Sequence, residues 1–130
     1  FNGDLKGKTI AVWGLSFKPD TDDMREAPSL VVISKLIEAG AVVKVFDPVA
    51  MEEAKHRVGN KVVYGKNIYD VAKEADAITL LTEWKQFRLP AWSKLKGLMK
   101  GNLVVDGRNI YDKTELEAEG FRYIGIGKNN

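Results

Sequence analysis

At 130 residues the chain has the length of one ordinary domain, and its 45% hydrophobic and 29% charged residues are typical of a globular rather than a disordered protein. A formal charge of only +2 argues against the clustered basic face that nucleic-acid binding requires. The absence of cysteine excludes disulfides, thiolate metal sites and a thiol nucleophile, and no apolar run is long enough to cross a membrane. We therefore expect no nucleic-acid partner, no membrane partner and a cytoplasmic location.

Short apolar runs alternate along the chain with segments of helical periodicity. The runs predict six strands, at residues 9–14, 42–46, 61–64, 77–81, 103–106 and 123–126. The periodic segments predict helices at residues 27–39, 51–57, 68–74, 91–99 and 114–119. Asn67 is a plausible cap of the third helix, and Pro90 delays the start of the fourth.

The pattern of these elements predicts an α/β fold. Strands this apolar are buried on both faces, as in a parallel sheet covered by helices on each side. Regular alternation of strand and helix implies right-handed crossovers and a doubly wound, six-stranded parallel sheet. We expect the Rossmann-like strand order 3-2-1-4-5-6, with a ligand crevice beyond the carboxyl ends of strands 1 and 4, where the winding changes direction.

The loop at residues 15–26, after the first predicted strand, is unusually long. Strand-to-helix loops usually take about 2–6 residues, whereas this one takes twelve and carries Lys18, Arg25 and several carboxylates. Gly14 stands alone, without the G-x-G-x-x-G pattern that lets a backbone hold a pyrophosphate. The loop is therefore either a binding loop built from side chains or a solvated loop whose charges cap the next helix.

Two other strands end in polar residues that the predicted order brings near this loop. Strand 4 runs into Glu83 and Trp84, and strand 5 into Arg108. With Lys18 these residues would surround the crevice, and its two cations would suit a phosphate, which a guanidinium binds through two parallel hydrogen bonds. The alternatives are a salt bridge from Arg108 to Asp106 or Glu83, and plain packing for Trp84.

Other candidate site residues favour structural roles. Asp47 stands where a dinucleotide-binding fold places its ribose-binding acid, but without the glycine pattern a turn or capping role beside Pro48 is favoured. His56, on a short polar helix, has no partner that predicts catalysis or metal binding, so we expect it at the surface. The lysines of the fourth helix are expected on its solvated side; they are Lys94, Lys96 and Lys100.

Four motifs make the interpretation specific. They are GLSFKPDTDDMREAPS at 14–29, FDP at 46–48, TEW at 82–84 and DGRN at 106–109. In this order, and at predicted strand ends, they closely resemble the carboxy-terminal UDP-binding domain of the UDP-glucose/GDP-mannose dehydrogenase family. The resemblance covers nearly the whole chain, and TDDMREAPS and TEWKQFR are most similar to the UDP-glucose 6-dehydrogenase branch.

The resemblance implies an NAD-dependent, two-step oxidation of UDP-glucose to UDP-glucuronate through a cysteine thioester. It implies that Phe17, Lys18 and Arg108 bind the UDP-sugar substrate. It also implies that Arg25 reaches across a domain junction to NAD, which the amino-terminal domain of the same enzyme mainly holds. That amino-terminal domain is thus an expected partner, and the full-length protein is expected to be a homo-oligomer.

By the same resemblance, residues 1–130 are a single UDP-sugar-binding, carboxy-terminal domain of a larger dehydrogenase, with a domain junction near residues 1–6. No catalytic residue and no metal ligand are expected in this chain, which without cysteine should be inactive by itself. Two kinds of alternative stay open. One is the same domain of a UDP-N-acetylmannosamine or GDP-mannose dehydrogenase. The other is a non-catalytic protein, either a flavodoxin-like nucleotide-binding domain or an interaction module.

Overall fold

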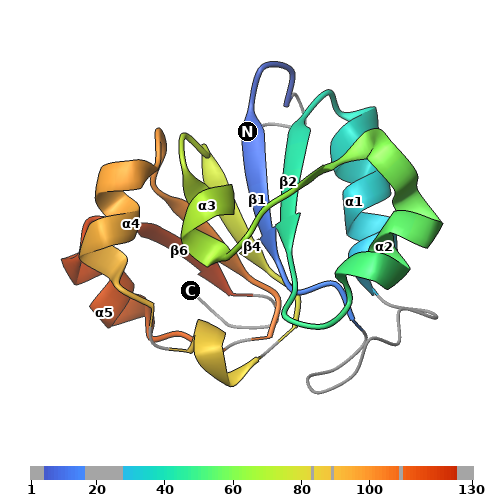
Figure 1. Cartoon of the computed structure of the whole chain (residues 1–130). Coiled ribbons are helices and arrows are strands. Elements are labelled where there is room, and N and C mark those ends of the chain that lie inside the picture. Colours follow the sequence, from blue (N-terminus) through green and yellow to red (C-terminus); the bar gives the residue numbers. More distant parts are fainter. Residues whose placement is uncertain (1–4, 17–27, 83, 89, 109, 126–130) are drawn as a thin grey trace.

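A computed structural model of the chain describes residues 5–16, 28–82, 84–88, 90–108 and 110–125. Within these ranges six strands form one parallel sheet in the order β3-β2-β1-β4-β5-β6, which confirms the predicted fold (Figure 1). The strands are β1 (Thr9–Trp13), β2 (Val42–Phe46), β3 (Val63–Tyr64), β4 (Ala77–Leu80), β5 (Leu103–Asp106) and β6 (Arg122–Gly125).

The helices of the described ranges connect successive strands. They are α1 (Pro28–Glu38), α2 (Met51–Val58), α3 (Ile68–Ala72), α4 (Trp92–Leu98) and α5 (Lys113–Ala118), with short 3₁₀ turns η1 (Gly59–Lys61) and η2 (Lys85–Phe87). The Asn67 side chain accepts a hydrogen bond from the Asp70 N–H at 2.8 Å, as predicted for a helix cap. None of the described helices has the length and apolar character that a membrane span needs.

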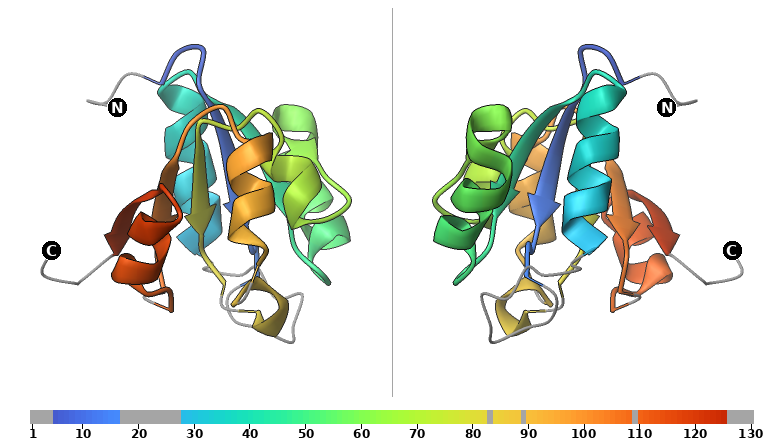
Figure 2. Two further views of the ribbon diagram at one scale, coloured as in Figure 1. Left: turned by 90° about the vertical axis from the view of Figure 1, so that its left-hand side faces the viewer. Right: turned by 90° about the vertical axis from the view of Figure 1, so that its right-hand side faces the viewer.

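The helices cover both faces of the sheet. α1 and α2 lie on one face, whereas α3, α4 and α5 lie on the other (Figures 1 and 2). Right-handed crossovers impose this division, because the chain winds outward from β1 to β3 and then returns past β1 to wind the other way from β4 to β6. The sheet is therefore buried on both sides, which explains why its central strands are so apolar.

Each face of the sheet has its own hydrophobic core, and β1 contributes to both. Ile10 and Val12 pack in the core beneath α1 and α2, whereas Ala11 and Trp13 pack in the core beneath α3, α4 and α5. Successive strand residues point to opposite faces, so one strand can serve the two cores. Trp13, which is fully buried, ends this strand.

The second core is rich in aromatic rings that gather around Trp92 of α4. Its ring is stacked on that of Trp13 at 6.3 Å and meets those of Tyr111 and Phe121 edge-on at 5.0 and 5.4 Å. Phe87 of η2 packs against Trp13 at 5.8 Å, and its carbonyl accepts a hydrogen bond from the Tyr111 hydroxyl. The segments that follow β4 and β5 are thus fixed to each other and to the sheet.

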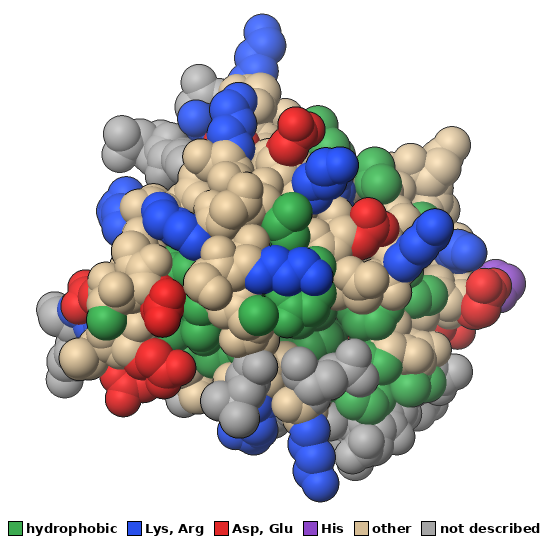
Figure 3. All heavy atoms as spheres, turned by 60° about the vertical axis from the view of Figure 1, so that its left-hand side comes forward, with side chains coloured by type: hydrophobic (Ala, Val, Ile, Leu, Met, Phe, Trp, Pro, Cys, Tyr) green, Lys and Arg blue, Asp and Glu red, His purple; other side chains and the backbone are tan. Residues whose placement is uncertain are grey.

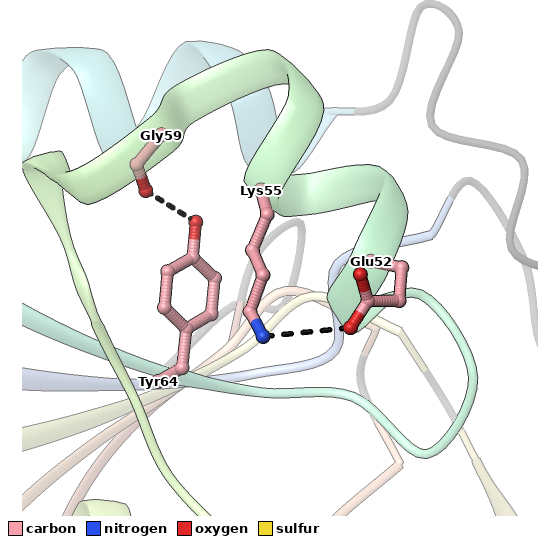
Figure 4. Close-up of polar contacts among 4 residues, drawn as sticks. All are labelled: Glu52, Lys55, Gly59 and Tyr64. Atoms are coloured by element: carbon pink, nitrogen blue, oxygen red, sulfur yellow. Dashed lines mark hydrogen bonds and ion pairs between the residues drawn. The ribbon is translucent and has the colours of Figure 1, made fainter.

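The third strand is shorter than predicted. Residues 61–64 were expected to be extended, but Gly59–Lys61 form η1 and only Val63 and Tyr64 pair with β2. The Tyr64 hydroxyl donates to the Gly59 carbonyl at 2.6 Å, which ties the strand back to the end of α2 (Figure 4). Lys55, paired with Glu52 at 3.4 Å, lies over the Tyr64 ring. These contacts partly bury the phenol, and that burial raises the pKa of Tyr64.

Candidate functional site

The ends of four neighbouring strands are aligned in a row. Trp13 of β1 pairs with both Phe46 of β2 and Leu80 of β4, and Leu80 in turn pairs with Asp106 of β5. The four loops that follow therefore start at the same level of one edge, at the bottom of Figure 1. This is the edge at which doubly wound sheets bind ligands, and the described residues of all four motifs lie at or beside it.

Gly14 lets the ends of β1 and β4 approach closely. Its backbone has a φ of +95°, and a Cβ atom built on it would lie 2.5 Å from the Cβ of Thr82. The Thr82 hydroxyl donates to the Ser16 carbonyl at 2.7 Å across the same gap. Gly14 thus allows two strand ends to pack closely. The glycines of a dinucleotide-binding loop instead allow the backbone to approach a pyrophosphate.

Asp47, at the end of β2, is a buried acceptor shared by three loops. One carboxylate oxygen, Oδ1, accepts from the backbone N–H groups of Val49 and Ala50 at 2.9 and 2.8 Å. The other, Oδ2, accepts from the Leu15 and Ser16 segment after β1 and from the Trp84 indole after β4. Asp47 is only 1% exposed, so its carboxylate makes these hydrogen bonds in the interior of the protein. The turn role is confirmed, whereas no described side chain caps α2 and the ribose-binding role is not supported.

Trp84 is buried at the edge of the aromatic core. Its side chain is 7% exposed, and its Nε1 donates to Asp47 at 3.1 Å. Of the two roles considered for this residue, packing is confirmed. Glu83, which the sequence placed beside the crevice, lies outside the described residues.

Asp106 organises the turn after β5. Its fully buried carboxylate accepts from the N–H groups of Arg108 and Tyr111 at 2.9 and 2.8 Å and from the Tyr123 hydroxyl at 2.9 Å. Gly107 has no room for a side chain, since a Cβ atom would lie 2.7 Å from the Leu80 carbonyl oxygen. The turn therefore has one fixed course, and it brings the half-buried Arg108 to the same edge as Ser16 and Trp84.

The two tyrosines around Asp106 have perturbed titrations. Burial, reinforced by the negative charge of Asp106, raises the pKa of Tyr111. Burial also raises the pKa of Tyr123, and the hydrogen bond that its hydroxyl donates to Asp106 raises it further. Both phenols are therefore neutral donors at physiological pH, which suits a buried carboxylate acceptor.

Three of the predicted site residues, Phe17, Lys18 and Arg25, lie outside the described residues. The structure does describe the residues that flank their segment. Ser16, just before it, is bonded to Asp47 and Thr82, and the Ser29 hydroxyl in the first turn of α1 donates to the Leu15 carbonyl at 2.5 Å. These flanking residues thus lie at the same edge as Arg108.

The histidine and the lysines singled out in the sequence have ordinary surface positions. His56 is exposed on α2, and the predicted solvated lysines Lys94, Lys96 and Lys100 are exposed on and after α4. Basic side chains are spread over the face in Figure 3, with acidic ones among them. Among the residues that the structure describes, no group of His, Asp and Glu side chains could hold a metal ion.

The hydrogen bonds of Asp47 were not foreseen from the sequence. Its partners Ser16 and Trp84 are 31 and 37 residues away, so no local pattern links them. The sequence did offer one signal. Ser16, Asp47 and Trp84 all follow predicted strand ends, and the predicted strand order makes these strands neighbours.

Comparisons with known proteins agree with the four motifs. A family model described as "UDP-glucose/GDP-mannose dehydrogenase family, UDP binding domain" matches residues 11–113. A UDP-glucose 6-dehydrogenase of Rhizobium meliloti is 46% identical over 130 residues, which cover 97% of this chain and 29% of that protein. The chain thus spans less than a third of the length of this relative.

Solved structures give the same result. A UDP-glucose dehydrogenase of Pyrobaculum islandicum matches with a TM-score of 0.82 and 33% identity, over 98% of this chain and 27% of that one. An NDP-N-acetyl-D-galactosaminuronic acid dehydrogenase of Methanosarcina mazei also matches with a TM-score of 0.82, at 30% identity, over 98% and 26% of the two chains. The two structures are equally similar in fold although their names give different sugars.

We expect Gly14→Ala to lower the free energy of unfolding by about 2–5 kcal/mol, because it adds both backbone strain and a clash with Thr82. Gly7→Ala is the matched control: Gly7 also has a positive φ, of +80°, but a Cβ atom there would meet nothing within 4 Å. Gly7→Ala should lower the free energy of unfolding by only about 1–2 kcal/mol, because it adds backbone strain alone. Denaturant unfolding measures both, and equal losses would contradict the proposed close approach.

We expect the stabilising effect of the Tyr123 hydroxyl to depend on pH. Because the folded-state pKa is raised, the contribution is complete below the ordinary tyrosine value of 10.0 and is lost as pH rises above it. Tyr123→Phe should therefore lower the free energy of unfolding by about 1.5–3 kcal/mol at neutral pH, as expected for a hydrogen bond to a charged group. The gap between variant and wild type should shrink as denaturant unfolding is repeated above pH 10.0. A constant gap would disprove the pH dependence.

Proposed function

The chain belongs to the UDP-glucose/GDP-mannose dehydrogenase family, and we propose that it is the nucleotide-sugar-binding, carboxy-terminal domain of an NAD-dependent UDP-glucose 6-dehydrogenase. The match to the UDP-binding part of the family and the identity to UDP-glucose 6-dehydrogenases support this proposal. The complete enzyme would oxidise UDP-glucose to UDP-glucuronate in the cytoplasm, as a homo-oligomer.

The substrate would bind at the carboxyl edge of the sheet. Lys18 and Arg108 would bind the diphosphate, and Phe17 would contact the substrate beside them. The observation that carries this assignment is the turn after β5, where Asp106 holds the Arg108 backbone at the same edge as Ser16 and Ser29. A guanidinium at this edge can donate two parallel hydrogen bonds to a phosphate.

NAD does not fit the described residues as a resident cofactor. The acid at the end of β2, which would bind a ribose in a dinucleotide-binding fold, is buried and bonded within the protein. Gly14 packs against Thr82, and no second glycine of a phosphate-binding pattern follows it. These features support the proposal that NAD is bound mainly by an amino-terminal domain, with Arg25 reaching towards it from this one.

The choice of sugar rests on sequence rather than fold. The scaffold is equally similar to a UDP-glucose dehydrogenase and to an NDP-N-acetyl-D-galactosaminuronic acid dehydrogenase, so the fold alone does not select the sugar. The high identity to UDP-glucose 6-dehydrogenases favours UDP-glucose. A non-catalytic nucleotide-binding or interaction domain is disfavoured, because all four family motifs are present.

The 130 residues by themselves should form no NADH from UDP-glucose and NAD. The family reaction passes through a cysteine thioester, and this sequence contains no cysteine. The measurement is absorbance of NADH over time, with the complete enzyme of a relative as the positive control. Turnover proportional to the amount of this chain would mean that the catalytic group lies within it.

Arg108→Ala should weaken UDP binding by about 10- to 150-fold, the equivalent of the roughly 1.5–3 kcal/mol that a charge-assisted hydrogen bond contributes. Arg108→Lys should restore only part of the affinity, because an ammonium group lacks the planar pair of donors. The matched control is Arg122→Ala, which removes an exposed arginine at the start of β6, away from the carboxyl edge.

The dissociation constant for UDP, measured by NMR titration, would test the role of Arg108 directly. Added salt should weaken wild-type binding more than that of Arg108→Ala. An Arg108→Ala variant that binds UDP like the wild type, but unfolds more easily, would show that Arg108 is a structural residue.

A further inference from the structure

We propose that Asp47 is a positioning residue for the UDP site: its buried carboxylate holds together the loops after β1, β2 and β4 at the edge where the substrate is proposed to bind. This inference rests on the proposed function, because the carboxyl edge is a substrate site only if the chain binds a nucleotide sugar. Asp47 itself touches no substrate and acts through Ser16 and Trp84.

The two carboxylate oxygens of Asp47 bind different parts of the chain. Oδ1 accepts from the N–H groups of Val49 and Ala50, which belong to the turn that follows Asp47 itself, so the carboxylate is oriented by its own loop. Oδ2 then points across the sheet edge to other loops. It accepts from the Leu15 N–H at 2.8 Å, from the Ser16 N–H and hydroxyl at 3.2 and 3.4 Å, and from the Trp84 indole at 3.1 Å.

Ser16 is held from both sides as a result. Its N–H and hydroxyl donate to Asp47 after β2, while its carbonyl accepts from the Thr82 hydroxyl after β4. The peptide groups before and after Ser16 are thus both hydrogen-bonded, which fixes the backbone of this residue between the ends of β2 and β4. Ser16 therefore has a defined place at the carboxyl edge, where UDP is proposed to bind.

Trp84 extends the same constraint to the loop after β4. Its indole N–H is bonded to Asp47, and the 3₁₀ turn that follows carries the fully buried Phe87 against Trp13. A single carboxylate therefore sets the spacing of the loops after β1, β2 and β4.

The hydrogen bonds at this position suit a carboxylate side chain. All the hydrogen bonds that described residues make to Asp47 are donated to it, and a carboxylate offers acceptors on both oxygens and no donor. In Asp47→Asn an NH₂ group must face either its own turn or the Ser16 and Trp84 donors. Because the site is buried, water cannot readily replace the lost acceptor.

Asp76→Asn provides a matched control for loss of stability. Asp76 is also a buried aspartate, 8% exposed, and its Oδ2 accepts from the Thr9 N–H at 2.8 Å. It lies just before β4 and bonds to the first residue of β1, so it joins the same two strands at the opposite edge of the sheet. Its substitution should destabilise the fold without altering the carboxyl edge.

The experiment compares the UDP dissociation constants of wild type, Asp47→Asn and Asp76→Asn by NMR titration, at a temperature where each is fully folded. Asp47→Asn should weaken UDP binding by about tenfold or more, the range in which residues that orient metal ligands act. It should also shift the Ser16 amide and Trp84 indole resonances before UDP is added. Asp76→Asn should bind UDP like the wild type.

Unchanged UDP affinity in folded Asp47→Asn, with wild type binding UDP, would overturn this inference and leave the proposed function intact. Failure of the wild type to bind UDP would overturn both. If Asp47→Asn does not fold, Trp84→Phe keeps an aromatic ring in place but removes one of the donors to Asp47. That variant should weaken UDP binding, and wild-type affinity in it would overturn the inference.

Discussion

The close approach of β1 and β4 at their carboxyl ends is the constraint on which the rest of this edge depends. A doubly wound sheet starts from these two strands and winds away in both directions, so the loops that follow them leave side by side on opposite faces. Gly14 makes the approach possible, because any side chain there would overlap Thr82. The approach brings Thr82 within hydrogen-bond distance of Ser16 and places Trp84 near Asp47. Without it, the loops after β1, β2 and β4 would have no common anchor.

Two buried carboxylates turn this geometry into a rigid edge. Asp47 joins the loops after β1, β2 and β4, and Asp106 joins the turn after β5 to β6 through Tyr123. In a dinucleotide-binding sheet the corresponding glycine and acid face the ligand, whereas here Gly14 and Asp47 serve contacts within the protein. Recognition of an anion would then be left to cationic side chains. This division suits the diphosphate contacts that we propose for Arg108 and Lys18.

The same scaffold occurs in dehydrogenases named for different sugars, which has a simple physical explanation. The sheet, its two cores and the aromatic cluster around Trp92 position the edge for which we propose anion binding, and none of these features contacts the sugar in that proposal. Sugar choice would then depend on the side chains that meet the hexose. A shared architecture with different sugars is the pattern expected when function is located in loops on a rigid support.

The sequence by itself determined the order and type of the elements, because these depend on local periodicity. It predicted β2 and β5 at their observed bounds, the Asn67 cap, and the strand order that places Arg108 near the end of β1. It also predicted Phe17, Lys18 and Arg25 as site residues, and these stay predictions. Tertiary structure decided the short β3, where the bond from Tyr64 to Gly59 favours a turn over further pairing. It also decided that Asp47 is an internal anchor: hydrogen bonds between residues 31 and 37 positions apart arise only when the strand ends are assembled, so no local pattern can reveal them.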